Sequence, residues 1–441
     1  MNILMMTNTY KPLVGGLERS VINFSKEFRG SSHRVMIVCP EYPDMKPEED
    51  VIRVPAMQNF NGSDFSVQLP IQGTLAEALG DFRPDIIHSQ HPFLIGDTAL
   101  KIASKYQVPL VFTHHTLYEE NVHYVPGNEE ALKRFVIELS TGYANLADQV
   151  FSPSESVMRL MKERGVTTPI DVVPTGIYID QFARGAGKTF RKKLNIPADA
   201  FVAGHVGRLA PEKNLEFLTR AIVQFLKKEP KAHFLIGGTG PSEGPIKEIM
   251  AKEGLTDRLH LAGMLKGKDL VSAYHAMDVF VFASQSETQG LVVTEAMAAR
   301  VPVVAVDASG VREVVKDHVN GCLIARESIE DFVSALAWLK KQPASQLLRI
   351  RNACRKTAKE FSMKDCAQRA LGLYVSLTVR QGFCRRTCED GRWSNAVRSI
   401  QTQWGLAKNL THATGAFMSP ALGTAQPIDG DTVQELAEAN V

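Results

Sequence analysis

Short apolar runs and helical patterns alternate along the first half of this chain. The apolar runs cover residues 3–7, 35–39, 85–90, 110–113, 149–151 and 170–173. The helical patterns between them cover residues 16–28, 96–105, 129–146 and 154–164. Strands that alternate with helices are typical of a parallel sheet covered by helices on both faces. The first half therefore predicts a doubly wound α/β domain.

The same alternation starts again near residue 200. Apolar runs cover residues 201–205, 233–236, 259–261, 279–282, 301–306 and 321–324. Helical patterns cover residues 215–227, 245–252, 268–276, 291–299, 311–317 and 329–340. Between the halves, residues 175–198 break the pattern with several glycines, and we interpret them as a linker. The chain therefore predicts two Rossmann-like domains facing across a cleft.

These patterns divide the chain into four regions. We expect an N-terminal domain at residues 1–178 and a C-terminal domain at residues 179–361. A closing helix within residues 362–380 is expected to pack back on the N-terminal domain. Residues 381–441 are expected to be a basic and then low-complexity tail, because the periodicity fades there.

Composition is that of a soluble globular protein. Hydrophobic residues make up 44% of the 441 positions and charged residues 22%, and no apolar run approaches the ~20 residues that span a bilayer. The chain starts directly with a strand pattern, so no secretory signal is expected. Cys384 and Cys388 form the only close cysteine pair, and without a neighbouring histidine they predict reduced thiols. We expect a cytoplasmic protein.

Charge is shared unevenly between the two halves. Residues 1–180 hold 15 basic and 22 acidic residues, whereas residues 181–441 hold 35 and 26, within a total net charge of +2. Residues 349–398 alone carry 12 basic and 4 acidic residues. A basic segment can contact anionic lipid or nucleic acid, although a solvated surface is its commoner meaning.

Two glutamates eight positions apart follow the apolar run at residues 279–282. Glu287 lies in the expected loop, and Glu295 lies in the helical pattern that begins after Gly290. A strand, a loop, a glycine and a helix point backbone N–H groups at an anion, because the first N–H groups of a helix lack partners within it. The two carboxylates could then meet two parts of one ligand. The alternative is an ordinary βα unit with surface carboxylates.

Arg208 and Lys213 follow the first apolar run of the second half, directly after Gly207. Two such cations at the end of a strand can bracket a diphosphate, the guanidinium through its forked donors and the ammonium as a point charge. The alternative is a solvated loop that precedes a helix.

Two glycine-rich loops deserve separate interpretations. Gly15 and Gly16 open the first helix, but no G-x-G-x-x-G follows the first strand, which weakens a dehydrogenase interpretation. Two glycines still let the backbone approach a ligand phosphate, and a tight turn without a ligand is the alternative. Residues 237–240 follow a later strand, and we interpret them as a plain turn.

Two adjacent histidines, His114 and His115, come at the end of the run at residues 110–113. Neighbouring side chains at a strand end point to opposite faces, so at most one of them should reach a ligand in the cleft. His88 and His91 could also line the cleft and receive no role. No histidine or carboxylate has zinc-site spacing relative to this pair, so we predict no metal site.

Taken in order, these motifs resemble the retaining GT-B glycosyltransferases of family GT4. The resemblance runs from Met1 to about Tyr374 and includes the Gly-Gly loop, T-H-H-T, P-T-G-I, G-R-x-x-x-x-K, E-x₇-E and the following V-P-V-V-A. Within the family the chain is most similar to bacterial 1,2-diacylglycerol 3-glucosyltransferases, because of S-E-T-Q-G and T-H-H-T-L-Y-E-E. One departure is Arg300, which stands where the family usually has glycine.

The resemblance implies roles for the residues that match the family motifs. Diphosphate binding falls to the two cations, sugar contacts to Glu287 and the histidine, and ribose contacts to Glu295. The implied catalytic residues are Arg208, Lys213, Glu287 and His115. The implied donor-binding residues are Gly16, Gly207, Gly290, Leu291 and Glu295.

Three interpretations of the activity remain open. The first is a membrane-surface α-glucosyltransferase that uses UDP-glucose and diacylglycerol, without a cofactor, a metal or a nucleic-acid partner. The second is the same donor chemistry on a soluble or polyprenyl-linked acceptor, and the third is a nucleotide-sugar epimerase or a non-catalytic binder. For peripheral contact with the inner membrane face, residues 129–146 offer a patch of Lys133, Arg134, Phe135, Ile137 and Tyr143, to which the basic residues 349–398 could add, with a core-packing helix as the alternative.

Overall fold

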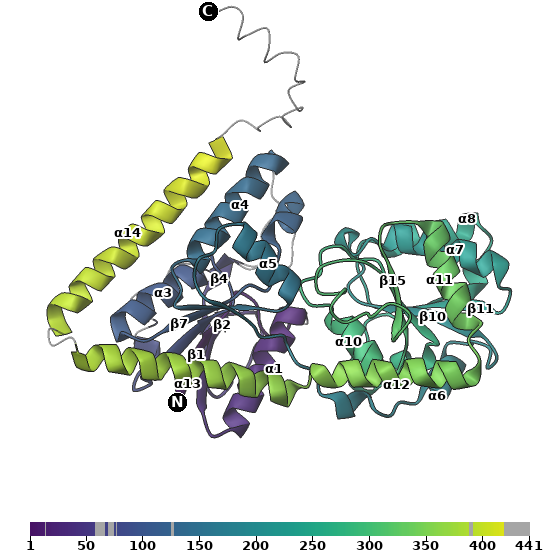
Figure 1. The fold of residues 1–441 in the computed structure, drawn as a ribbon, viewed down its shortest axis with the longest axis horizontal. Coiled ribbons are helices and arrows are strands. Elements are labelled where there is room, and N and C mark those ends of the chain that lie inside the picture. Colours follow the sequence, from purple (N-terminus) through teal and green to yellow (C-terminus); the bar gives the residue numbers. More distant parts are fainter. Residues whose placement is uncertain are drawn as a thin grey trace, which may run out of the picture.

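The structure is a computed structural model. It describes residues 1–13, 15–57, 67–68, 75, 77–124, 128–387 and 391–418. Two α/β domains lie side by side, and three long C-terminal helices extend along them (Figure 1). Within the described residues, no helix combines the length and the apolar character needed to cross a membrane.

The first domain is built on a seven-stranded parallel sheet with the order β3-β2-β1-β6-β7-β8-β9. Its strands are β1 (Asn2–Met6), β2 (Arg34–Pro40), β3 (Val51–Val54), β6 (Ile86–Ser89), β7 (Leu110–Thr113), β8 (Gln149–Ser152) and β9 (Ile170–Val172). Its helices are α1 (Gly16–Gly30), α3 (Ile95–Tyr106), α4 (Glu129–Ala144) and α5 (Glu155–Glu163). The pattern did not predict β3, whose apolar run is interrupted by Arg53, or the antiparallel pair β4 (Ala56–Met57) and β5 (Val67–Gln68), whose two residues each are too few to show a period.

The second domain holds a six-stranded parallel sheet with the order β12-β11-β10-β13-β14-β15. Its strands are β10 (Phe201–Val206), β11 (Ala232–Gly237), β12 (Leu259–Leu261), β13 (Val279–Phe282), β14 (Val303–Val306) and β15 (Gly321–Ile324). Its helices are α6 (Gly187–Lys193), α7 (Leu215–Lys228), α8 (Glu243–Lys252), α9 (Gly267–Ala276), α10 (Leu291–Ala298) and α11 (Ile329–Lys340).

Two expectations about the second domain were wrong. The expected linker contains α6, which packs against α9 and buries Phe190 in the domain core. The expected helix at residues 311–317 forms turns instead, because the Asn320 side chain accepts the Lys316 N–H (2.8 Å) and donates to the Val314 carbonyl (2.9 Å). Arg300 has φ of +61°, the left-handed region that favours glycine, which explains why a glycine is common at this position.

In each sheet the strand order reverses beside the first strand of the domain. β1 lies between β2 and β6, and β10 lies between β11 and β13. In open α/β sheets, ligands bind outside the carboxyl ends of the strands at such a switch point. The loops that follow β1, β6, β10 and β13 are therefore positioned to form a site.

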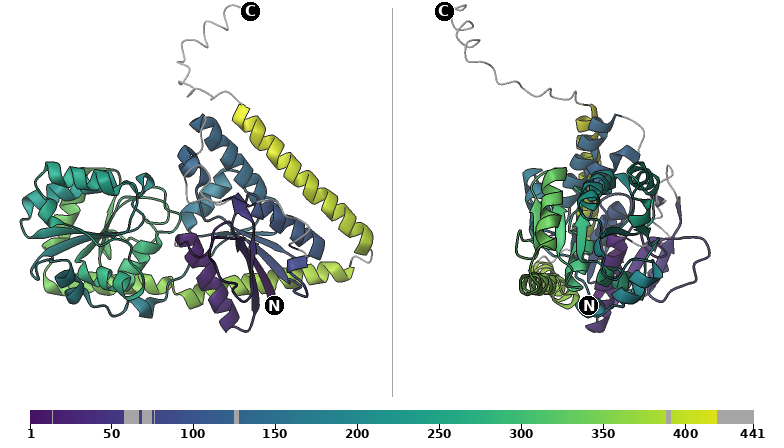
Figure 2. Two further views of the ribbon diagram at one scale, coloured as in Figure 1. Left: turned by 180° about the vertical axis from the view of Figure 1, so that it is seen from behind. Right: turned by 90° about the vertical axis from the view of Figure 1, so that its right-hand side faces the viewer.

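Helices cover both faces of the first sheet. One face packs against α1 and α13 (Met363–Thr387), and the other packs against α3, α4 and α5. On α13, the Tyr374 hydroxyl donates to His88 Nδ1 (2.5 Å) and its ring stacks on Phe151 with centroids 5.9 Å apart. The long helices α12 (Ala344–Glu360) and α13 run end to end along the two domains, so the chain returns from the second domain to the first (Figures 1 and 2).

The segment after residue 380 differs from the expected tail. α13 continues to Thr387, and α14 (Gly391–Met418) forms a long helix that lies along α4 and α3 (Figure 1). Asn409 Nδ2 donates to the Leu139 carbonyl (3.0 Å), which ties α14 to α4. The pattern missed α14 because its small and weakly polar residues carry little contrast between faces. Cys388, of the close cysteine pair, lies outside the described residues.

Candidate active site

Helix α10 begins at the switch point of the second sheet, directly after the loop that follows β13. Gly290 precedes the helix with φ of +71°, and no side chain caps the helix start. Glycine adopts this left-handed conformation without the steric cost that other residues meet. The uncapped first turn therefore presents backbone N–H groups, which favour an anion.

Lys213 and Glu287 meet at this edge of the second sheet. Lys213 Nζ donates to Glu287 Oε1 at 2.5 Å, and the two side chains are 22% and 16% exposed. The loops that carry them are joined as well, because the Ser284 and Ser286 hydroxyls donate to the Glu212 carbonyl (3.2 and 3.3 Å). The predicted cation and the predicted sugar-binding carboxylate are thus brought together.

Arg208 lies in the same loop but pairs differently. Its guanidinium contacts the carboxylate of Glu212, which is 9% exposed, whereas the Arg208 side chain is 44% exposed. The ion pair leaves the guanidinium at the surface of the loop, a few residues from Lys213. The sequence predicted both cations but not Glu212 as the partner of Arg208.

Glu295 is buried one turn inside α10, and both of its carboxylate oxygens have partners. Tyr274 on α9 donates its hydroxyl to Oε2 (2.8 Å), and Arg19 on α1 donates to Oε1. Burial raises the pKa of Glu295, and the charge of Arg19 opposes that rise. Since α1 belongs to the first domain, the Arg19–Glu295 pair joins the two domains across the site.

Three further contacts join the domains at residues 288–291. The Thr288 hydroxyl donates to the His115 carbonyl (2.9 Å). Gln289 Oε1 accepts the Thr175 N–H (2.7 Å), and Gln289 Nε2 donates to the Thr175 carbonyl. A Cβ atom at Gly16 would lie 3.6 Å from Leu291 Cδ1. The Gly-Gly loop, the strand-end histidine and the start of α10 therefore lie together, as the resemblance implied.

Four histidines lie at or just after the carboxyl ends of β6 and β7 in the first domain, and three of them, His88, His91 and His114, are buried. Burial lowers the pKa of His88, His91 and His114 to about 3, and lowers the pKa of His115 well below its usual value. His115 Nε2 donates to Gln90 Oε1 (2.7 Å). Within the described part of the chain, neither ring nitrogen of His114 has a hydrogen-bond partner. These rings are therefore neutral at physiological pH.

The glycine-rich loop at residues 237–240 supports the Arg208 loop from behind. A Cβ atom at Gly238 would lie 1.8 Å from the Gly207 carbonyl oxygen, and one at Gly240 would lie 2.4 Å from the Leu209 carbonyl oxygen. Gly207 N–H in turn donates to the Gly237 carbonyl (3.0 Å). The glycines are needed for close backbone approach, which fits the interpretation of this loop as a structural turn.

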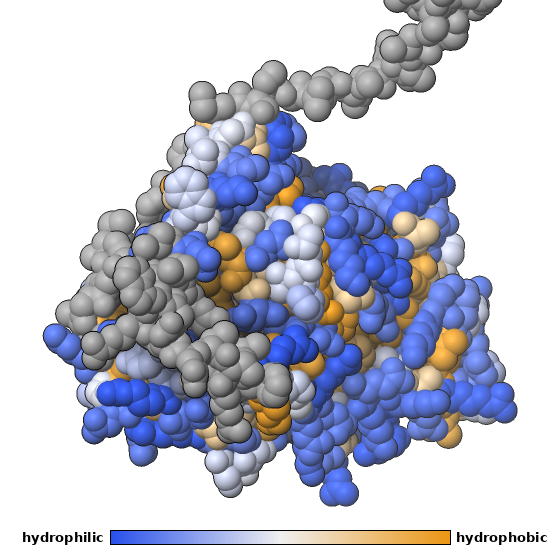
Figure 3. Space-filling model, turned by 60° about the vertical axis from the view of Figure 1, so that its left-hand side comes forward, coloured by the Kyte–Doolittle hydropathy of each residue, from blue (hydrophilic) through white to orange (hydrophobic). Residues whose placement is uncertain are grey.

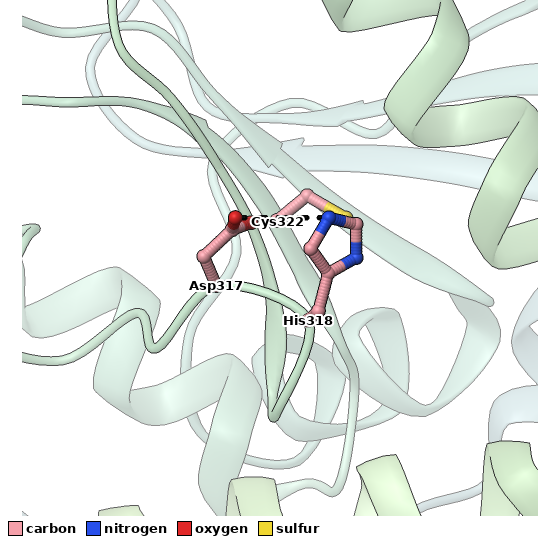
Figure 4. A group of neighbouring side chains, drawn as sticks. All are labelled: Asp317, His318 and Cys322. Atoms are coloured by element: carbon pink, nitrogen blue, oxygen red, sulfur yellow. Dashed lines mark ion pairs between the residues drawn. The ribbon is translucent and has the colours of Figure 1, made fainter.

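One group of described side chains brings metal-ligand atoms together. The ligand atoms of Asp317, His318 and Cys322 lie within 4.8 Å of one another (Figure 4). The group lies at the amino end of β15, whereas Glu287 follows the carboxyl end of β13, so the two occupy opposite edges of the parallel sheet. Asp317 Oδ1 already accepts the Leu323 N–H (3.0 Å), a role in the turn. The group is separate from the candidate active site.

Sequence reasoning missed three residues that shape the site. Arg19 and Tyr274 hold the Glu295 carboxylate, and Gln289 bonds both backbone groups of Thr175. Arg19 lies three positions after Gly16 in the first turn of α1, so its closeness to the Gly-Gly loop was the one available signal. The other two contacts depend on how distant elements meet.

Two Rossmann-like domains that meet at their switch points, with cations and a helix start at the junction, define the GT-B fold. Sequence profiles agree: the profile described as "Glycosyl transferases group 1" matches residues 187–361, and "Glycosyltransferase Family 4" matches residues 14–181. The chain belongs to glycosyltransferase family 4, and it is a glycosyltransferase.

Two relatives can be aligned with most of this chain. The alpha-monoglucosyldiacylglycerol synthase of Streptococcus pneumoniae is 30% identical over 404 residues, which are 90% of each chain. The enzyme of the same name from Acholeplasma laidlawii is 27% identical over 383 residues, covering 83% of this chain and 96% of the relative.

Solved structures share the fold at lower identity. Sucrose-phosphate synthase from Thermosynechococcus elongatus superimposes with a TM-score of 0.71 at 20% identity, covering 86% of this chain and 99% of that chain. Anabaena HepE in complex with UDP-glucose gives a TM-score of 0.69 at 19% identity, covering 86% of this chain and 100% of that chain.

Proposed function

We propose that the protein transfers glucose from UDP-glucose to a hydroxyl group of diacylglycerol, with retention of the α configuration. The observation that carries this proposal is the set of groups at one junction: Lys213 and Glu287, the start of α10, and the buried Glu295. The names of the two monoglucosyldiacylglycerol synthases, which match along most of the chain, support the sugar and the lipid acceptor.

The site supplies the means to stabilise a departing diphosphate. As the bond between the glucose anomeric carbon and the diphosphate oxygen breaks, negative charge grows on that oxygen. Lys213, Arg208 and the N–H groups at the start of α10 offset this charge. The acceptor hydroxyl forms its bond to the same face of the anomeric carbon, and a diphosphate oxygen takes its proton.

The remaining predicted residues hold the donor. Glu295 accepts hydrogen bonds from the ribose hydroxyls, and Glu287 binds hydroxyls of the glucose. Neither glutamate acts as a nucleophile in this proposal, because Glu287 pairs with Lys213 and the buried Glu295 is held by Arg19 and Tyr274. His115, which is neutral, can contact the sugar without adding charge. Gly16 lets the backbone approach the β-phosphate.

The donor and the acceptor are tested together. Purified protein is incubated with UDP-glucose, other UDP-sugars and GDP-mannose, each with diacylglycerol vesicles or with soluble inositol phosphate, and the product anomer is determined by NMR. We expect an α-glucosyl lipid from UDP-glucose. Transfer only to the soluble acceptor would reject the lipid, and donor consumption without any acceptor would indicate an epimerase or hydrolase.

A lipid acceptor places the reaction at a membrane surface, so the proposal includes peripheral contact with the membrane. Of the five side chains suggested for this contact from the sequence, two are engaged by α14, and a third, Tyr143, is buried. Arg134 Nε donates to the Ala416 carbonyl (3.1 Å), and the Phe135 ring meets Phe417 with centroids 6.4 Å apart. The contact surface therefore has to be found elsewhere.

A further inference from the structure

Helix α14 exposes large apolar side chains to solvent. Trp404 is 73% exposed, Leu410 is 53% exposed and Phe417 is 41% exposed. Across residues 401–417 the only Lys, Arg, Asp or Glu residue is Lys408. Helix α12 has the same length as this 17-residue stretch of α14, and it contains Arg349, Lys359 and four other charged residues. A solvent-facing helix normally carries charge on its outer face, so the outer face of α14 is unusual.

The opposite face of α14 is already occupied by the first domain. Asn409 bonds to α4, and a Cβ atom at Gly405 would lie 2.8 Å from Leu146 Cδ2. Ala413 is fully buried in this contact. The exposed residues thus lie on a helix whose inner side is fixed. Figure 3 shows orange apolar patches scattered among blue hydrophilic regions on the face of the molecule that it presents.

The direction of α14 brings its C-terminal end toward the carboxyl edge of the first sheet. It runs antiparallel to α4, since Gly405 lies near the end of α4 and Phe417 lies beside Phe135 near its start. The start of α4 follows the segment after His115, at the carboxyl edge of the first sheet. The end of α14 therefore lies on the side of the first domain that holds the site.

The charge of α14 indicates what covers the exposed face. Its 28 residues include Arg392, Arg398 and Lys408 and no acidic residue. A helix that combines exposed apolar and aromatic side chains with positive charge suits an anionic lipid surface, where the tryptophan ring lies at the headgroup level. A protein partner that binds through salt bridges fits this face less well, because residues 401–417 contain only one charged side chain, that of Lys408.

We propose that the exposed face of α14 is the surface by which this protein docks on an anionic membrane. Trp404 and Leu410 enter the interfacial region, and Phe417 enters at the end nearest the candidate site. The role of this surface in catalysis rests on the proposed lipid acceptor. Vesicle binding, however, can be measured without any glycosyl transfer. The two proposals can therefore fail separately.

Vesicle co-sedimentation of the full chain tests the surface. Trp404→Ser and Leu410→Ser should each weaken binding to phosphatidylglycerol-containing vesicles by about tenfold or more, because each removes an apolar side chain from the interface. Leu348→Ser on α12 is the matched control, since Leu348 is 56% exposed, and it should bind as wild type does. Binding to pure phosphatidylcholine vesicles should be weaker, and salt should reduce the difference.

Tryptophan fluorescence gives a second readout that reports on position. In a Trp338→Phe, Trp393→Phe background, the emission of Trp404 should shift to shorter wavelength with anionic vesicles and be quenched by brominated lipid. No shift together with unchanged binding of both serine variants would overturn the proposal. It would equally be overturned if Trp404→Ser abolished a dimer without changing vesicle binding, since the face would then join two copies of the chain.

A turnover assay with a water-soluble short-chain diacylglycerol separates the two proposals. If the serine variants keep wild-type turnover on this acceptor and lose it on vesicles, both the acceptor and the surface are supported. If no variant or wild-type protein glycosylates diacylglycerol while vesicle binding follows the expected pattern, the proposed function fails and the docking surface stands.

Discussion

The two domains contribute opposite kinds of chemistry to their junction. The second domain brings charge: Lys213 pairs with Glu287, and Glu295 lies buried in α10. The first domain brings backbone groups and histidines, of which the partly exposed His115 has a pKa well below its usual value. Under the proposed function, this difference assigns recognition of the charged donor to the second domain and binding of the uncharged acceptor to the first.

One residue crosses this division. Arg19 belongs to the first domain, yet its guanidinium contacts Glu295 in the second. The contact couples the charge of the donor side to the position of α1, which also carries the Gly-Gly loop at its start.

The largest effect is expected from the cations of the second domain. Lys213→Ala and Arg208→Ala should each lower kcat by about 100-fold or more, because each removes a group that stabilises the leaving diphosphate. Lys231→Ala is the matched control, since Lys231 is an exposed lysine that pairs with Asp199 at 2.6 Å. Steady-state kinetics on proteins with unchanged circular dichroism measures the effect. Near-normal turnover of the Lys213→Ala variant would show that Lys213 does not stabilise the leaving diphosphate.

A smaller effect is expected from the residue that crosses between the domains. Arg19→Ala should raise the KM for the donor by about tenfold, because a hydrogen bond to a charged group is worth about 1.5–3 kcal/mol. Arg19→Lys should recover part of the loss.

The pH profile of the Arg19 variant distinguishes positioning from a merely structural role. Burial raises the pKa of Glu295 and Arg19 lowers it, while Tyr274 is the other partner of the carboxylate. Without Arg19 that pKa rises further, so the carboxylate becomes protonated at higher pH and donor binding is lost earlier on acidification. The acid limb of kcat/KM should therefore move to higher pH. An unmoved limb would contradict the account.

Acid should destabilise the first domain, which buries three histidines in the neutral form. His88, His91 and His114 have pKa values lowered to about 3 by burial, against about 6.5 in the unfolded chain. The unfolded state then binds more protons, so stability is lost as pH falls below about 6.5 and continues to fall toward pH 3. Each histidine contributes about 1.4 kcal/mol per pH unit in that window. Denaturant midpoints measured between pH 7 and pH 5 test this expectation.

His114→Phe isolates one histidine's share of that acid sensitivity. The ring lies against Phe112 and Tyr118, with centroids 5.9 and 5.8 Å away, and its nitrogens have no hydrogen-bond partner among the described residues. Phenylalanine therefore loses no bond, and the slope of stability against pH should become shallower. An unchanged slope would show that His114 does not stay neutral in the folded protein.

The smallest effect is expected from metal removal. The charge at the junction comes from Lys213, Arg208 and the start of α10, and the Asp317, His318 and Cys322 group lies at the other edge of the sheet. Incubation with EDTA should leave the transfer rate unchanged. A rate that falls with EDTA and returns with a divalent cation would add a metal to the site.

Most of the architecture could be predicted from the sequence, because strand and helix patterns depend on residues that are close together in the chain. Runs such as residues 279–282 show the strand period directly, and Glu287 and Glu295 are placed by their distance from Gly290. Arg208 and Lys213 follow a strand in the same way. What these residues touch is not local: the Glu212 partner of Arg208 is set by the loop conformation.

The contacts that close the junction could not be predicted for the same reason. Arg19 and Glu295 are 276 positions apart, and their contact depends on how two domains meet. α14 was missed because its small residues give no strong period, and its helix is supported by packing against α4. Local patterns thus identify the strongly periodic elements, whereas weakly periodic elements such as α14 and the pairings between elements require the fold.

The central claim is that the second domain grips a diphosphate, and calorimetry with UDP and uridine tests it most directly. Wild-type protein should bind UDP much more tightly than uridine, because only UDP reaches Lys213 and the start of α10. Lys213→Ala should lose most of that difference while it binds uridine as before. If Lys213→Ala bound UDP as tightly as wild type does, the claim would be contradicted.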